Sequence, residues 1–116
     1  MSMETGLSII VPSFNSGSVI DLCLKAIDRE SKDIDQPYEI LVVDSSPNPP
    51  ELPDISELKL HHSDRQLFAS EARNLGARIA KYPVLIFLDS DVEILPGAIE
   101  RLLNGLGENS DVVGGV

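Results

Sequence analysis

The stretch VLIFLDSDVEI, from Val84 to Ile94, carries the clearest structural signal in this sequence. Its apolar first half ends at two aspartates, Asp89 and Asp91, which are separated by a single residue. An uninterrupted apolar run of this kind is typical of a strand that is buried on both faces. Two like charges in one turn repel each other unless a hard cation such as Mg²⁺ or Mn²⁺ is bound, and such cations prefer carboxylate oxygens as ligands. The stretch therefore predicts a buried strand that leads directly into a candidate metal site.

Strands of similar character are predicted elsewhere along the chain. LSIIVPS (Leu7–Ser13) and YEILVVD (Tyr38–Asp44) are nearly continuous apolar runs, and each passes into polar residues. A weaker strand is predicted over LKLHHS (Leu58–Ser63), and the closing DVVGGV looks like the start of another. Each run is short and apolar enough to be a strand in the interior of a sheet.

Helical patterns alternate with these strands. SVIDLCLKAIDRE (Ser18–Glu30) repeats apolar residues at helical spacing, which predicts a buried face and places Glu30 on the solvated one. FASEARNLGARIAKY (Phe68–Tyr82) collects small residues, Gly76 among them, on a face that can lie close to a sheet. A third helix is predicted to open at Pro96. Apolar strands that alternate with amphipathic helices favour a three-layer α/β/α fold with a mostly parallel sheet.

In such a sheet, ligands bind beyond the carboxyl ends of the strands. The predicted topology brings polar residues from three strands to that edge: Ser13 and Asn15, Asp44, and the pair Asp89 and Asp91. For any single aspartate, a loop or a helix cap is the ordinary role. The paired aspartates after a buried strand favour metal binding instead.

Composition limits the classes of function. The 116 residues, 42% of them hydrophobic, suffice for one compact domain, and the formal net charge of −10 disfavours a nucleic-acid partner. A divalent cation would still let an acidic protein bind a phosphorylated small molecule. The single cysteine, Cys23, has apolar neighbours and is predicted to be a buried thiol. No apolar run reaches the roughly 18 residues of a membrane span, and the start lacks a signal-peptide pattern, so the expected location is the cytoplasm.

The segments LSIIVPSFN, YEILVVDSS and ASEARNLGARIAKYPVLIFLDSDVEILPGAIERL resemble, in order and spacing, the nucleotide-binding half of family 2 glycosyltransferases, which have the GT-A fold. The resemblance runs from about Leu7 to Val116. Its most specific part is the D-x-D that follows a strand, with ARNLGA upstream and VVD further up. The resemblance implies metal-dependent, inverting transfer of a sugar from a nucleotide-diphosphate donor to a sugar, lipid or protein acceptor.

The resemblance also implies roles for the residues that match the family pattern. The loop from Pro12 to Asn15, which includes Ser13, would lie against the nucleoside, and Asp44 would face the base or the ribose. Arg73, with Asn74 beside it, matches a position near the nucleotide.

Within the D-x-D, the resemblance places Asp89 near the ribose, and Asp91 on a Mn²⁺ or Mg²⁺ ion that bridges the diphosphate. Because the two carboxylates lie in one turn, Asp89 is kept as a candidate metal ligand beside Asp91. Ser45 stands where the family commonly has a second acid that contacts the base, which leaves the base preference open.

The general base and the acceptor segment of the family belong to a C-terminal half that would follow Val116. Residues 1–116 are therefore expected to form a single donor-binding domain that binds without efficient transfer, and no catalytic residue is assigned. A sheet edge left uncovered would be a candidate surface for a homo-oligomer.

Two other classes of function fit parts of the pattern. FLDSDV also matches the nucleophile motif of haloacid-dehalogenase-type phosphatases, but that motif normally follows the first strand and needs a later lysine, whereas no lysine follows Lys81. A non-enzymatic α/β interaction or regulatory module is the other alternative. Binding of a nucleotide would distinguish an enzyme domain from such a module.

Four further side chains have ordinary interpretations. His61 and His62, at the end of the weak strand, are expected to be exposed or partly hydrogen-bonded rather than metal ligands. Phe68 is interpreted as a packing residue and Glu71 as a solvated residue of its helix.

Overall fold

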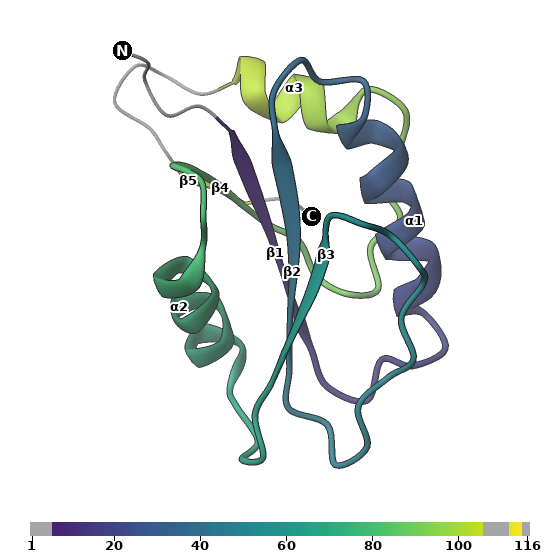
Figure 1. The fold of residues 1–116 in the computed structure, drawn as a ribbon, viewed down its shortest axis with the longest axis vertical. Helices are drawn as coiled ribbons and strands as arrows, with labels where there is room; N and C mark the ends of the chain where they lie inside the picture. The colour runs from purple at the N-terminus through teal and green to yellow at the C-terminus, as the bar shows by residue number, and fades with distance from the viewer. Residues whose placement is uncertain (1–5, 106–111, 115–116) are drawn as a thin grey trace.

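The computed structural model describes residues 6–105 and 112–114, which form one sheet with helices on both faces (Figure 1). All strand pairs are parallel, and the order of the strands is β3-β2-β1-β4-β5. The three-layer α/β/α fold predicted from the sequence is confirmed. The strands are β1 (Leu7–Ser13), β2 (Tyr38–Asp44), β3 (Leu58–His62), β4 (Val84–Phe87) and β5 (Val112–Gly114), and the helices are α1 (Ile20–Ser31), α2 (Ala69–Ile79) and α3 (Ala98–Asn104).

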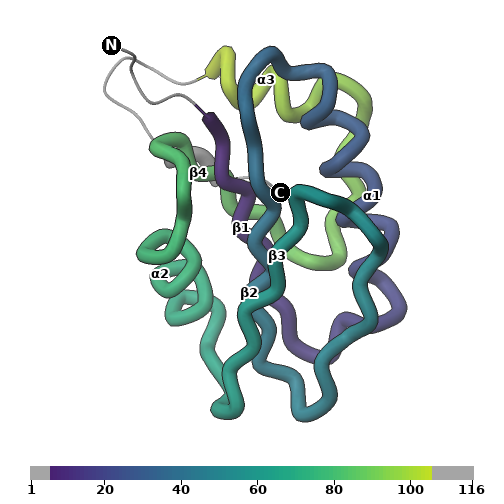
Figure 2. The backbone as a smooth tube through the Cα atoms, viewed as in Figure 1, coloured from purple at the N-terminus to yellow at the C-terminus, as the bar shows by residue number. Residues whose placement is uncertain are grey.

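The two faces of the sheet bury alternate residues of the central strands. On β1, Leu7 and Ile9 belong to a core cluster that includes Leu24 of α1, whereas Ile10 packs with Ala72 of α2 on the opposite face. The chain passes from β1 to β2 through α1 on one side of the sheet, and from β3 to β4 through α2 on the other (Figure 2). Because both faces are covered, the central strands read as continuous apolar runs in the sequence.

Helix α2 lies very close to the sheet, as its small residues predicted. A Cβ atom placed on Gly76 would lie 2.5 Å from Cγ2 of Ile10, well inside van der Waals contact. Ala72 and Gly76 are buried, whereas Ile79, which ends the helix, is exposed. The helical spacing in the sequence predicted that Ile79 also lies on this face, so the face of α2 that contacts the sheet is narrower than predicted.

Pro12 is part of β1 without breaking a ladder of hydrogen bonds. The carbonyl of Ile10 accepts from the amide of Leu88, so the backbone hydrogen-bonding groups of Ile10 point toward β4. Those of Pro12, two residues later, point to the same side. Strand β4 has already ended at Phe87, so no β4 residue needs the missing N–H of Pro12. The strand thus continues to Ser13, at the edge where the candidate site lies.

Two predictions about the helices were wrong. Helix α3 begins at Ala98 rather than at Pro96, because Gly97 precedes it with a left-handed φ of 80°. The amide of Gly97 donates to Oε1 of Glu30 at 2.7 Å, and Nε of Arg29 lies 2.8 Å from Oε2. Glu30 is therefore buried rather than solvated. The hydrogen bonds from Arg29 and from Gly97 lower the pKa of Glu30 below its ordinary value.

Within residues 6–105, no helix is both long enough and apolar enough to cross a membrane.

Candidate functional site

An open pocket of about 430 Å³ lies at the carboxyl edge of the sheet, between the loop after β1, the start of α2 and the turn after β4. A volume of this size is typical of small-molecule sites. Five of the residues that the sequence selected line the pocket, and these are Pro12, Ser13, Asn15, Asp89 and Asp91. The topology therefore brings together side chains that are far apart in sequence. Two selected residues, Asp44 and Arg73, do not line it.

The loop after β1 forms one wall of the pocket in an uncommon backbone conformation. Asn15 has a φ of 53°, in the left-handed region that only a few residue types, asparagine among them, adopt readily. The backbone amide of Asn15 donates to Oγ of Ser46 at 2.7 Å. Ser46, just after β2, therefore fixes the position of the loop after β1 that forms this wall.

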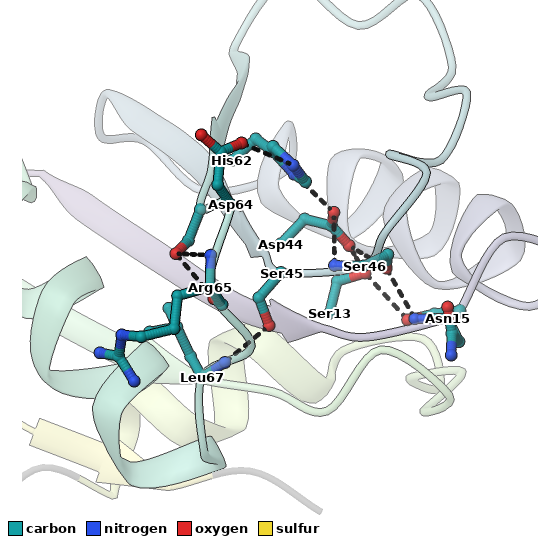
Figure 3. A network of polar contacts seen from close by, with 11 residues as sticks. Ser13, Asn15, Asp44, Ser45, Ser46, His62, Asp64, Arg65 and Leu67 are labelled. Carbon is teal, nitrogen blue, oxygen red and sulfur yellow. Dashed lines mark hydrogen bonds and ion pairs between the residues drawn. The ribbon is translucent and has the colours of Figure 1, made fainter.

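Asp44 lies beneath this wall and is fully buried. Its Oδ1 accepts from the hydroxyls of Ser13 at 2.9 Å and Ser46 at 2.7 Å. Its Oδ2 accepts from the amide of Ser46 at 3.1 Å and lies 3.0 Å from Nδ1 of His62 (Figure 3). All four hydrogen bonds are to protein groups, so Asp44 supports the pocket from below. Its contact with a base or a ribose stays a prediction.

The turn after β4 presents the two aspartates of the D-x-D to the pocket. Both are exposed, and Nη2 of Arg73 lies 3.3 Å from Oδ1 of Asp89. The hydroxyl of Ser90, between the two aspartates, donates to Oγ of Ser16 at 3.0 Å and so ties this turn to the loop after β1. Arg73 thus approaches the site through Asp89 rather than as part of the pocket wall.

The donor atoms fit part of a metal site. No group of three or more His, Cys, Asp or Glu side chains suited to a metal occurs among the residues that the structure describes. The turn offers the carboxylates of Asp89 and Asp91, and a hard cation takes six or more oxygen ligands. A cation bound here would need most of its ligands from a phosphorylated ligand and from water. Asp91, which has no cationic partner in the described part of the chain, is the freer of the two.

Cys23 lies behind this turn, and its Sγ is 3.5 Å from the carbonyl oxygen of Asp89. Burial, with a smaller contribution from the charges of Asp91 and then Asp89, raises the pKa of the thiol to about 11. The buried thiol predicted from the sequence is confirmed. At neutral pH it is a protonated packing residue and not a nucleophile.

The pocket also includes residues that received no individual role from the sequence, although Phe14 lies within the predicted loop from Pro12 to Asn15. Phe14, a residue that is 42% exposed, lines the pocket. Ser45 also lines it, and its Oγ accepts from the amide of Leu67 at 3.0 Å. The available signal for Phe14 was its position as the single aromatic residue in the polar segment SFNSGS. Nothing local in the sequence marks Leu67, since it reaches the pocket through the tertiary fold.

The remaining interpretations had mixed outcomes. Phe68 is 76% exposed, so its interpretation as a packing residue was wrong. Glu71 accepts from the amide of Phe68 at 2.9 Å and pairs with Arg65 at 3.0 Å, so it caps α2 rather than being merely solvated. Arg65, and then the amide of Phe68, lower its pKa. The expectation that the two histidines are exposed or partly hydrogen-bonded is confirmed, because His61 is exposed and His62 is partly buried and bonded to Asp44.

Comparisons with known proteins agree with the geometry. A family model described as "Glycosyl transferase family 2" matches residues 8–116. The chain is 28% identical to an "Uncharacterized glycosyltransferase" of Haemophilus influenzae, over 91% of this chain and 36% of the relative. It is 31% identical to the "Chondroitin synthase" of Pasteurella multocida, over 97% and 12%, and 32% identical to "Poly(ribitol-phosphate) beta-N-acetylglucosaminyltransferase TarP" of Staphylococcus aureus, over 92% and 35%. The chain thus spans from 12% to 36% of the length of these curated relatives.

Proposed function

This chain belongs to the family 2 glycosyltransferases, and from that premise we propose that it binds the nucleotide-diphosphate sugar donor in the pocket at the carboxyl edge of its sheet. The observation that carries the proposal is the meeting of Asn15, Asp89 and Asp91 at one pocket. The exposed ring of Phe14 offers a stacking surface for a nucleobase, and the polar turn after β4 lies beside it.

The two aspartates have different roles in this proposal. Asp91 holds a divalent cation together with the diphosphate, and Asp89, which Arg73 orients, lies toward the ribose. The cation would neutralise the phosphates and stabilise the nucleoside diphosphate as a leaving group. Without it, a chain with a net charge of −10 would repel a diphosphate, so binding should depend on the metal.

Inverting transfer also needs a base that takes the proton of the acceptor hydroxyl. Among the residues described, the carboxylates at the pocket are Asp89 and Asp91, and both are assigned to the donor. We therefore propose that residues 1–116 are the donor-binding domain and that the base lies in another part of a longer enzyme, as the greater length of the relatives suggests. The donor sugar, the base and the acceptor are left open.

Two expectations about the whole protein stay predictions. The first is a cytoplasmic location. The second is a homo-oligomer formed through an edge of the sheet, for which β3 is a candidate because it is an outer strand of the described sheet and Leu60 on it is exposed.

Calorimetric titration with UDP and with GDP, each with and without Mn²⁺, tests the proposal. We expect binding only with the metal, and a loss of roughly 10-fold or more in affinity for Asp91→Ala. Glu93→Ala is the matched control, because Glu93 is an exposed acid two residues further along that does not line the pocket. Both variants remove one negative charge, so a difference between their affinities for the nucleotide reports a specific role of Asp91.

Binding that is equally strong in the two variants, or in the absence of metal, would contradict the role of Asp91. A folded wild-type chain that binds neither nucleotide would contradict the proposed donor site as a whole.

A further inference from the structure

One wall of the pocket depends on a residue in an uncommon backbone conformation. Asn15 is the one non-glycine residue with a positive φ among the residues that the structure describes, and its amide is held by Oγ of Ser46. The hydroxyl hydrogen of Ser46 is directed to Oδ1 of Asp44, which leaves the oxygen of Ser46 free to accept from Asn15. Asn15 is therefore fastened to the carboxylate of Asp44 through a single serine.

The turn that carries the D-x-D is fastened to the same carboxylate. A carboxylate oxygen only accepts, so Ser13 must donate its hydrogen to Oδ1 of Asp44. Ser16, whose Oγ lies 2.9 Å from that of Ser13, must then donate to Ser13, and it in turn accepts from Ser90. Each hydroxyl in this series, from Ser90 through Ser16 and Ser13 to Asp44, can therefore donate one hydrogen to the next residue. The two walls of the pocket thus meet at one buried group.

The charge of Asp44 has one partner outside these two branches. Asp44 and His62 are paired in the register of β2 and β3, and Nδ1 of His62 lies 3.0 Å from Oδ2. Among the residues described, no lysine or arginine forms an ion pair with Asp44. The side chain of His62 is 25% exposed, and that of Asp44 is fully buried. His62, on the outer strand β3, is therefore the residue that compensates the buried charge of Asp44, to which both walls of the pocket are hydrogen-bonded.

We propose that His62 is a positioning residue of the donor site, which acts through Asp44 on Asn15 and on the turn of Ser90 without touching the nucleotide. His62 does not line the pocket. Nδ1 carries the hydrogen, since Oδ2 of Asp44 can only accept, and this bond fixes the plane of the carboxylate against which Ser13 and Ser46 are arranged (Figure 3). The inference rests on the proposed function, because the pocket is taken to be the donor site.

Three variants of the full chain test the inference. His62→Ala removes the donor. His62→Asn restores it, because Nδ2 of asparagine stands as many bonds from the backbone as Nδ1 of histidine. His61→Ala is the matched control, since His61 is the exposed preceding residue of β3 and its side chain points to the other face of the sheet.

Two readouts are combined. Calorimetric titration with UDP and GDP in the presence of Mn²⁺ gives the affinity separately from the fraction of competent protein. NMR spectra of the ligand-free chain give the amide shifts of Asn15 and Ser90. We expect His62→Ala to weaken binding roughly 3- to 10-fold at unchanged stoichiometry and to shift both amides. His62→Asn should recover most of the affinity and both shifts, and His61→Ala should change neither.

The outcomes separate this inference from the function on which it rests. A purely structural role of His62 would lower the competent fraction in the titration and leave the affinity of the remainder unchanged, which would overturn the proposal. An unchanged affinity with unshifted amides in His62→Ala would also overturn it. If the wild type binds neither nucleotide, the proposed function fails, and the amide shifts still decide whether His62 controls the two walls. If His62→Ala does not fold, Ser46→Ala removes the serine that connects Asp44 to Asn15. An unshifted amide of Asn15 in that variant would contradict the proposed connection between Asp44 and this wall.

Discussion

Two buried acids occupy opposite ends of β2, and each connects neighbouring elements. Asp44 joins the walls of the pocket at the carboxyl end. At the amino end, Glu39 accepts from the hydroxyl of Ser8 at 2.6 Å, from the amide of Lys81, and from Nζ of Lys59 at 3.3 Å. Burial alone would raise the pKa of Glu39, but these three donors together lower it below its ordinary value of 4.5.

A lowered pKa in the folded chain makes a definite prediction about acid stability. Glu39 contributes its full stability above pH 4.5, its pKa when unfolded, and this contribution is lost as the pH falls through the lower folded pKa. Glu39→Gln should therefore lower the free energy of unfolding by about 1–3 kcal/mol at pH 7, and by clearly less near pH 3. Urea unfolding at both pH values measures the difference.

Glu93→Gln serves as the control for this experiment, because Glu93 is exposed and should show no such dependence. A deficit of Glu39→Gln that is equal at both pH values would mean that the charge of Glu39 is not what stabilises the fold.

Among the helices and strands, the sequence pattern predicts the bounds best where burial is complete. The predicted bounds of β1 and β2 are the observed bounds, because strands covered on both faces leave continuous apolar runs with sharp ends. Helix α3 was harder, since Gly97, and not the preceding proline, sets its start. Glu30 was misplaced because its partner is an amide 67 residues later, which no helical periodicity reports.

The contact between α2 and β1 gives a prediction at this scale. Gly76→Ala adds a methyl group 2.5 Å from Cγ2 of Ile10, a buried β-branched side chain with little room to move. The gain in helix propensity, about 1 kcal/mol, should not offset the overlap. We expect a net loss of about 1–3 kcal/mol in the free energy of unfolding, measured by denaturant titration.

Gly17→Ala is the matched control, because a Cβ at Gly17 meets no atom within 4 Å. Its free energy of unfolding should stay within about 0.5 kcal/mol of the wild type. Equal losses in the two variants would indicate that glycine conformation, and not close packing of α2, determines the result.

At the scale of the whole molecule, the location of the site follows from topology. Parallel strands bring their carboxyl ends to one edge, so Ser13, Asn15 and Asp89 could be predicted to meet without any contact being known. The hydrogen bonds that surround the buried Asp44 could not be predicted, because one of its partners, His62, comes from the neighbouring strand β3. The exposure of Phe68 was equally hidden, since an aromatic residue at the start of a helix is compatible with either environment.

NMR can map where the nucleotide binds on the chain. A ¹⁵N-labelled sample is titrated with UDP and with GDP in the presence of Mg²⁺. If the donor binds in the pocket at the carboxyl edge, amide shifts should change around that pocket, with Asn15, Ser45 and Ser90 among the most affected. Another cavity, of about 350 Å³, lies at the amino edge of the sheet beside Lys59 and Tyr82, and amides around it should be unaffected. Changes centred on that second cavity, or no changes at saturating nucleotide, would contradict the claim that this glycosyltransferase domain binds its donor at the carboxyl edge of the sheet.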